Sequence, residues 1–118
     1  MATFHQQVSV GPKDGSRFQH VIALVDTAAT YAVMPGPLLT MLGIAPEWAG
    51  VFELAGGGRE ERGLAEVRLR IDVAERTTIC VFGRPDSQPV LGKYALDGFG
   101  LAADEAHGTL VPARLFLA

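Results

Sequence analysis

One acidic residue, Asp26, lies where a carboxyl group is hard to solvate. It follows the aliphatic run 21–25 and precedes four small or hydroxylated residues, in the sequence Asp-Thr-Ala-Ala-Thr. Burial disfavours the charged form of a carboxyl group unless donors or a partner compensate, and catalytic acids are made in this way. A structural role also fits, in which Asp26 caps a turn by accepting a hydrogen bond from the backbone N–H of Ala28 or Ala29. The residues alone leave both roles open.

Other residues that carry chemistry in proteins lack suitable partners here. His5, His20 and His107 show no metal-ligand spacing, and the single cysteine, Cys80, does not complete a zinc site. Cys80 lies in an apolar stretch and is expected in the core. The glycine triplet 56–58 is not followed by Lys-Ser/Thr, so it favours a mobile hairpin tip over a phosphate-binding loop.

The elements that must position these residues are mostly strands, because apolar and polar residues alternate with a period of two. The clearest strand covers 67–73, where Val67, Leu69, Ile71 and Val73 alternate with charged residues. Further strands are expected at 4–10, 17–25, 48–54, 76–82, 101–103 and 109–111, with the last pair closing the sheet.

Two short helices are expected between the strands. Pro35 and Pro37 suit the first turn of a helix that ends at Gly43, and Gly92 leads into a second helix over residues 93–99. Two aromatic residues near the expected flap, Trp48 and Phe52, fit either the core or the wall of a site.

Composition narrows the class of protein. The chain has 118 residues, with 10 Lys and Arg against 13 Asp and Glu, a net charge of -3. That length predicts one domain, and that charge argues against nucleic acid or an anionic membrane as a partner. Prolines interrupt the uncharged stretch 27–46, which excludes it as a membrane span, and residues 1–7 lack the features of a signal peptide. The expected compartment is cytoplasmic.

Several motifs in order resemble retroviral-type (retropepsin-like) aspartic proteases. Residues 25–30, followed by Val-Met-Pro at 33–35, resemble the active-site segment of that family, Asp-Thr/Ser-Gly-Ala and often Thr. The glycine triplet lies where the family has its flap, and Pro-Val-Leu-Gly at 89–92 resembles its second element. Residues 100–112 resemble the ending of small bacterial members.

The resemblance implies an all-β fold: a small closed β-barrel with one or two short helices, in a single domain over residues 1–118. It implies an aspartic endopeptidase active as a homodimer, because one chain supplies a single Asp26 and the mechanism needs two carboxylates. Such a pair shares a proton and activates a water for attack on a peptide bond. A peptide or protein substrate is implied, with no metal and no other cofactor.

Roles for the neighbouring residues are also implied by the resemblance. Thr27 would hydrogen-bond across to the other subunit and, with Ala28, support the carboxylates. Substrate would contact the residues that follow the motif and the flap tip, namely Ala29, Thr30, Gly56, Gly57 and Gly58.

Two departures from the family pattern matter. Ala28 replaces the motif glycine; it keeps the backbone N–H, and it is strained by about 1 kcal/mol or more only if its φ is positive. Ala28 therefore leaves three interpretations open. The chain is a working protease that tolerates the alanine, a weakened enzyme, or an inactive dimeric binding or regulatory module of the same fold. Thr30 and Lys93 occupy positions where viral members have an Asp and an Arg that brace the site, and they cannot form that ion pair. A monomeric barrel unrelated to proteases is a further alternative.

Overall fold

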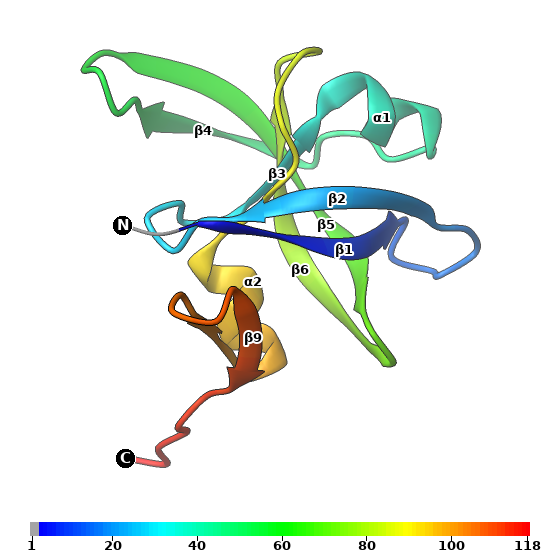
Figure 1. Cartoon of the computed structure of the whole chain (residues 1–118). Coiled ribbons are helices and arrows are strands. Elements are labelled where there is room, and N and C mark those ends of the chain that lie inside the picture. The colour runs from blue at the N-terminus through cyan, green and yellow to red at the C-terminus, as the bar shows by residue number, and fades with distance from the viewer. Residues whose placement is uncertain (1–2) are drawn as a thin grey trace.

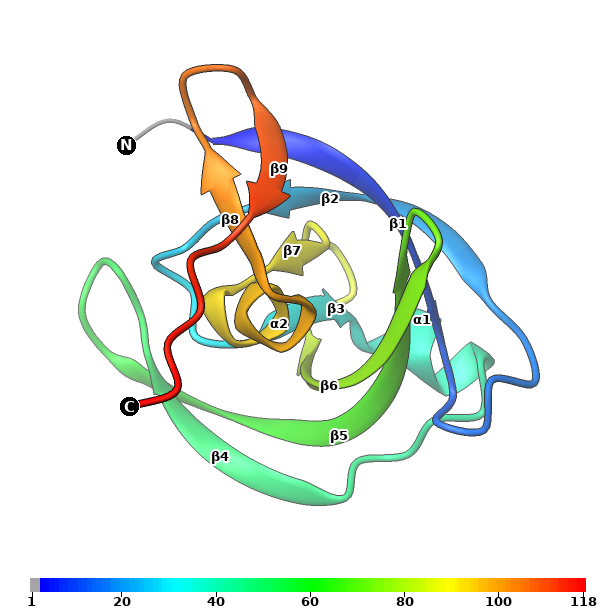
Figure 2. The same ribbon diagram turned by 90° about the horizontal axis from the view of Figure 1, so that it is seen from below.

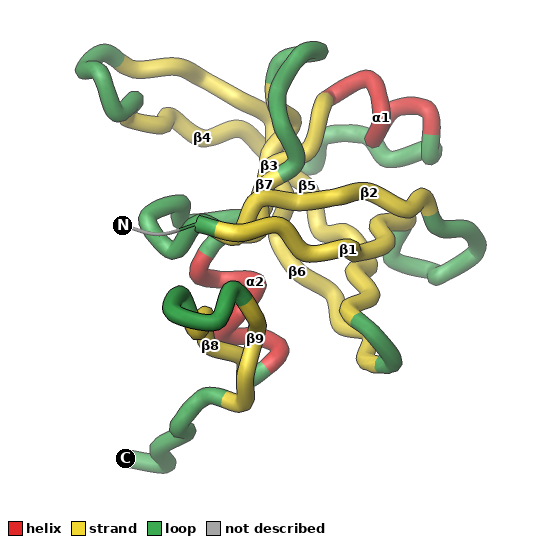
Figure 3. Tube along the Cα trace, viewed as in Figure 1, coloured by secondary structure: helices red, strands yellow, loops and turns green. Residues whose placement is uncertain are grey.

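The computed structural model describes residues 3–118, and strands make up about half of it (Figures 1 and 3). Two short helices, α1 (Gly36–Met41) and α2 (Lys93–Phe99), interrupt the strands. Neither helix in this described range is long and apolar enough to cross a membrane. The strands are β1 (Phe4–Gly11), β2 (Gln19–Val25), β3 (Ala32–Pro35), β4 (Trp48–Glu53), β5 (Arg59–Ile71), β6 (Ala74–Gly83), β7 (Val90–Leu91), β8 (Leu101–Asp104) and β9 (Thr109–Pro112).

Six of the strands close into a barrel. Their order is β1-β2-β7-β3-β6-β5, and β5 pairs with β1 to complete the ring. Most neighbours are antiparallel, but β2 with β7 and β3 with β6 are parallel. Figure 2 shows α2 lying across one opening of the barrel. The expectation of an all-β closed barrel with two short helices is confirmed.

The hydrophobic core fills the barrel because alternate side chains of each strand point inward. In β5 this places Val67, Leu69 and Ile71 inside, as the alternation predicts. Leu39 of α1 and Leu96 of α2 cover the core from outside the strands. The largest side chains with almost no solvent exposure are Met34, Leu39, Leu64, Leu69, Leu91, Val10, Val67 and Cys80.

Two sequence expectations are wrong. Val73 is fully exposed, because β5 ends at Ile71 and the chain reverses through Asp72, whose φ is 53°. The last two strands, β8 and β9, do not close the sheet; they form a separate two-stranded sheet next to α2. The barrel is closed instead by pairing of β1 with β5, with Val10 opposite Leu69.

One hairpin arm projects from the barrel. It consists of β4 and the first part of β5, and Figure 1 shows it extending away from the ring. We call residues 48–62 the flap. Its tip turns at Gly57 and Gly58, which have φ values of 89° and 91° that favour glycine.

Candidate active site

The turn that carries Asp26 begins where β2 leaves the barrel. The N–H of Asp26 donates to the carbonyl oxygen of Leu91 at 3.0 Å, which ties the end of β2 to β7. The Oδ1 atom of Asp26 accepts a hydrogen bond from the N–H of Ala28 at 3.0 Å, and its carbonyl oxygen accepts one from Ala29 at 3.1 Å. The half-buried carboxyl group is therefore oriented by its own turn, while Thr27 and Ala28 are exposed.

Helix α2 holds the far side of this turn. The N–H of Lys93 donates to the carbonyl oxygen of Ala29 at 2.8 Å, and the N–H of Tyr94 donates to that of Thr30 at 2.9 Å. These N–H groups belong to the first turn of α2, where no partner exists within the helix. The Lys93 side chain lies elsewhere, with Nζ 3.0 Å from Asp97. Main-chain hydrogen bonds thus hold the turn on α2.

Gly92 permits this close approach between the turn and the helix. A Cβ atom at this position would lie 2.4 Å from the carbonyl oxygen of Tyr31 and 2.7 Å from that of Ala29. Both atoms belong to the backbone, so a side chain at position 92 would displace the turn. The Pro-Val-Leu-Gly motif therefore has a structural reason for its glycine.

Ala28 adopts an ordinary backbone conformation. Across residues 3–118, Asp72 is the one non-glycine residue with a positive φ. The strain that a positive φ would bring to Ala28 is therefore absent, and its N–H keeps the hydrogen bond to Asp26.

A cleft of about 740 Å³ lies between the turn and the flap. The floor is formed by residues 28–31, and β4 of the flap contributes residues 51–54. Glu60 and Arg62 of β5 line the same cleft, together with Val81, Gly83, Arg84 and Ser87 from β6 and the loop that follows it. A smaller cavity of about 340 Å³ flanks the turn on the side of α2 and is lined by Thr27 and by residues 28–30, 93, 94 and 97.

The structure brings some of the sequence-predicted residues together and leaves others apart. Ala28, Ala29 and Thr30 line the cleft, whereas Asp26, two residues before Ala28, is not among its lining residues. The glycine triplet 56–58 is not among the lining residues, because the flap meets the cleft through its arms rather than its tip. The role of the triplet in substrate binding stays a prediction.

Aromatic side chains join the flap to the turn. The Phe52 ring packs edge-on against Tyr31, with 6.4 Å between ring centroids, and Tyr31 packs against Tyr94 at 5.5 Å. Phe52 therefore belongs to the wall of the cleft. Sequence reasoning missed Tyr31, although its place directly after the Asp26 motif was a usable signal.

A charged cluster lines the opposite part of the cleft. The Glu60 carboxylate accepts hydrogen bonds from Arg84 Nη2 and from Arg62 Nε, each at 2.5 Å. These two guanidinium groups lower the pKa of Glu60, with Arg84 having the larger effect. We call Glu60, Arg62 and Arg84 the clasp. Sequence reasoning missed it, because the charged run 59–62 is also typical of a solvated strand.

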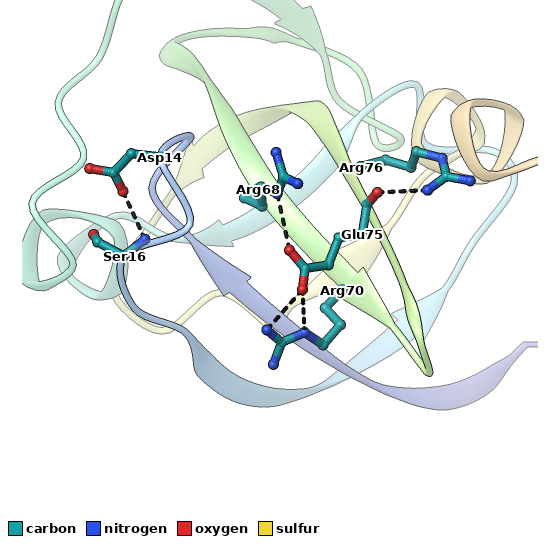
Figure 4. Close-up of polar contacts among 6 residues, drawn as sticks. All are labelled: Asp14, Ser16, Arg68, Arg70, Glu75 and Arg76. Carbon is teal, nitrogen blue, oxygen red and sulfur yellow. Dashed lines mark hydrogen bonds and ion pairs between the residues drawn. The ribbon is translucent and has the colours of Figure 1, made fainter.

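Three charged residues outside the cleft, Arg68, Arg70 and Glu75, pair with one another. Figure 4 shows Arg68 and Arg70 of β5 on the carboxylate of Glu75 in β6, at 3.1 Å and 2.9 Å. Their hydrogen bonds lower the pKa of Glu75. The guanidinium of Arg70 also lies over the Phe18 ring, 4.0 Å from its centroid. This outer face of the barrel is a network of ion pairs.

The remaining reactive side chains do not form a second site. Cys80 is buried, and burial raises the pKa of its thiol to about 12, which makes the thiolate scarce. His20 shares a hydrogen bond with Ser9 at 2.8 Å, and His107 lies 2.9 Å from Asp104. Within residues 3–118, no three His, Cys, Asp or Glu side chains are grouped as a metal ion requires.

Comparison with known proteins supports the fold. No family model matches the sequence, and no curated protein matches it. Among solved structures, the solution structure of the protease of simian foamy virus (mac) matches with a TM-score of 0.55. The chain has a retropepsin-like fold. The two sequences are 13% identical, and the match covers 78% of this chain and 92% of the viral one.

Proposed function

We propose that this chain is one subunit of a homodimeric aspartic endopeptidase, in which each copy supplies one Asp26. The observation that carries the proposal is the placement of the Asp26 turn within a retropepsin-like fold. The carboxyl group is held by the N–H of Ala28, and the turn forms the floor of a cleft roofed by the flap. In this proposal residues 1–118 act as a single domain.

The proposed chemistry needs two carboxyl groups that share a proton. The ionised carboxylate removes a proton from a water as the water attacks the peptide carbonyl carbon, and the protonated partner donates to the carbonyl oxygen. The tetrahedral intermediate collapses when the amide nitrogen receives a proton and leaves as an amine. The two groups titrate as a pair, because like charges at close range oppose double ionisation.

The exposed turn provides the surface for the second copy. Thr27 and Ala28 are solvent-exposed in the isolated chain, and the neighbouring Tyr94 is 48% exposed. A second copy that meets this face would cover these groups and bring two Asp26 carboxylates together. Thr27 would then hydrogen-bond across the interface and hold both carboxylates in place.

An extended peptide is the substrate that suits the cleft. Much of its wall is apolar, with Tyr31, Val33, Val51, Phe52 and Val81 among the lining residues. The flap lies along the opposite side as a hairpin, and extended peptides bind such strands through main-chain hydrogen bonds. In the proposal, Ala29 and Thr30 contact the peptide from below and the glycines 56–58 from above.

The decisive experiment replaces Asp26 by Asn and measures peptide cleavage. The amide oxygen of Asn still accepts the hydrogen bond from Ala28, so the turn is preserved while the carboxyl group is lost. We expect cleavage of a fluorogenic peptide library at mildly acid pH to fall by about a hundred- to ten-thousand-fold. Cleavage that survives in Asp26→Asn, or that a statine-type inhibitor does not affect, would refute the proposal.

The Ala28→Gly variant completes this experiment by testing the inactive-module alternative. Because Ala28 has an ordinary φ and keeps its N–H, we expect the native chain to cleave, and the variant to cleave within a few-fold of it. An inert native chain beside an active Ala28→Gly chain would instead favour the binding module.

A further inference from the structure

Backbone pairing does not fix the flap against the side of the barrel where β6 lies. The antiparallel ladder between β5 and β6 begins at the Ile71–Ala74 pair and stops at Leu64 opposite Val81. Beyond Leu64, β5 continues for five residues that pair only with β4. The contacts between the flap and this side of the barrel are therefore made by side chains rather than by strand pairing.

The clasp supplies a side-chain contact where the ladder has ended. Arg84 lies in the loop between β6 and β7, and its Nη2 atom donates to Oε2 of Glu60 on the flap at 2.5 Å. Arg62 donates to the other carboxylate oxygen, Oε1, from two residues along the same strand. Arg62 thereby orients Glu60 toward Arg84.

The solvent exposure of the three clasp side chains is what we expect if the ion pair between Glu60 and Arg84 can open and close. Glu60 and Arg62 are partly buried at 23% and 27% exposure, whereas Arg84 is 62% exposed. The carboxylate is thus held on the flap while its partner on the loop remains accessible to water. Exposed ion pairs of this kind are weak and are screened by salt.

We propose that Arg84 positions the flap over the cleft, acting through Glu60. The catalytic consequence rests on the proposed function, because it concerns the cleft in which the peptide would bind. Releasing the clasp lets the flap move away from the turn and weakens peptide binding, without touching Asp26. Arg84 is therefore a positioning residue. The edge-on contact of Phe52 with Tyr31 also joins the flap to the turn, and it does not depend on charge.

Hydrogen exchange of the flap amides tests the proposal without requiring activity. We expect Arg84→Gln to speed exchange over residues 48–62 by about two- to fivefold, the range that an exposed ion pair supports, and to leave the β6 core unchanged. Glu60→Gln should give the same increase, and the double variant no more than either single one. Raising the salt concentration should speed exchange of the native flap and not that of the variants.

Arg59→Gln is the matched control, because Arg59 lies on the same flap and makes no ion pair with any residue from 3 to 118. It should leave flap exchange unchanged. If the chain cleaves peptides, Arg84→Gln should raise KM and leave kcat within twofold. Unchanged flap exchange in Arg84→Gln, or additive effects in the double variant, would overturn the proposal. The exchange result stands even if Asp26 proves not to be catalytic.

Discussion

Replacing Gly92 by Ala should displace the Asp26 turn, and the structure gives the size of the effect. The new Cβ would lie 2.4 Å from the carbonyl oxygen of Tyr31, roughly 1 Å short of ordinary van der Waals contact. Since the atom it meets belongs to the backbone, rotation of a side chain cannot relieve the overlap. The turn and α2 must separate.

That separation has two energetic consequences. Overpacking of a fitted interior costs about 1–3 kcal/mol. The hydrogen bonds from Lys93 to Ala29 and from Tyr94 to Thr30 weaken, at about 0.5–1.5 kcal/mol each. We expect a loss of about 2–6 kcal/mol in the free energy of unfolding, a large part of the 5–15 kcal/mol typical of a domain.

Gly98→Ala, within α2, is a control that should change the free energy of unfolding in the opposite direction. A Cβ at position 98 meets nothing within 4 Å, and Gly98 has no positive φ, so this variant should gain about 0.5–1 kcal/mol from helix propensity. Urea unfolding followed by circular dichroism measures both variants, and amide chemical shifts of residues 26–31 report the position of the turn. A Gly92→Ala protein as stable as the native chain, with unmoved shifts, would refute the reasoning.

Two further predictions concern groups away from the cleft. Cys80 should resist alkylation by iodoacetamide in the folded protein at mildly alkaline pH, because burial raises the pKa of its thiol to about 12. It should react once denaturant is added. Rapid labelling of the native chain would contradict its buried position. Glu75→Gln should lower stability at neutral pH, and the difference from the native chain should shrink with acidification. The pKa of Glu75 is below its ordinary value when folded, so its contribution is complete above that ordinary value and is lost as the pH falls through the lowered one. A difference in urea midpoint that stays constant with pH would count against the Arg68 and Arg70 pairing.

Local sequence patterns predict the long strands well, but they miss the short strands β3 and β7 and predict the connections less well. The alternation in β5 identifies Val67, Leu69 and Ile71 as core residues, but it gives no sign that the strand ends before Val73. The reversal depends on Asp72 at positive φ, and no glycine, proline or asparagine marks it. Which strands pair with each other is harder still to predict, because closure of the barrel pairs β1 with β5, about sixty residues later in the sequence.

The candidate site, too, can be predicted from the local sequence only in part. Asp26 can be singled out from its neighbours alone, and the turn-capping role proposed as an alternative proves compatible with the catalytic one, since the Ala28 N–H that caps the turn also orients the carboxylate. The clasp has no local signature. It unites residues 24 positions apart, and its existence depends on where the ladder between β5 and β6 stops.

The two positions at which the family pattern has glycine differ in what the backbone demands. At position 92 the demand is spatial, because any Cβ meets carbonyl oxygens of the turn. At position 28 the backbone does not have a positive φ, so glycine is not required there. Asp26 needs only the N–H of this residue as a hydrogen-bond donor, and alanine supplies it. Alanine at the first position therefore keeps the carboxylate in place, whereas a side chain at the second position would displace the turn. This asymmetry is why Ala28 does not by itself argue against a working Asp26, and why Gly92 is the more sensitive test of the site's architecture.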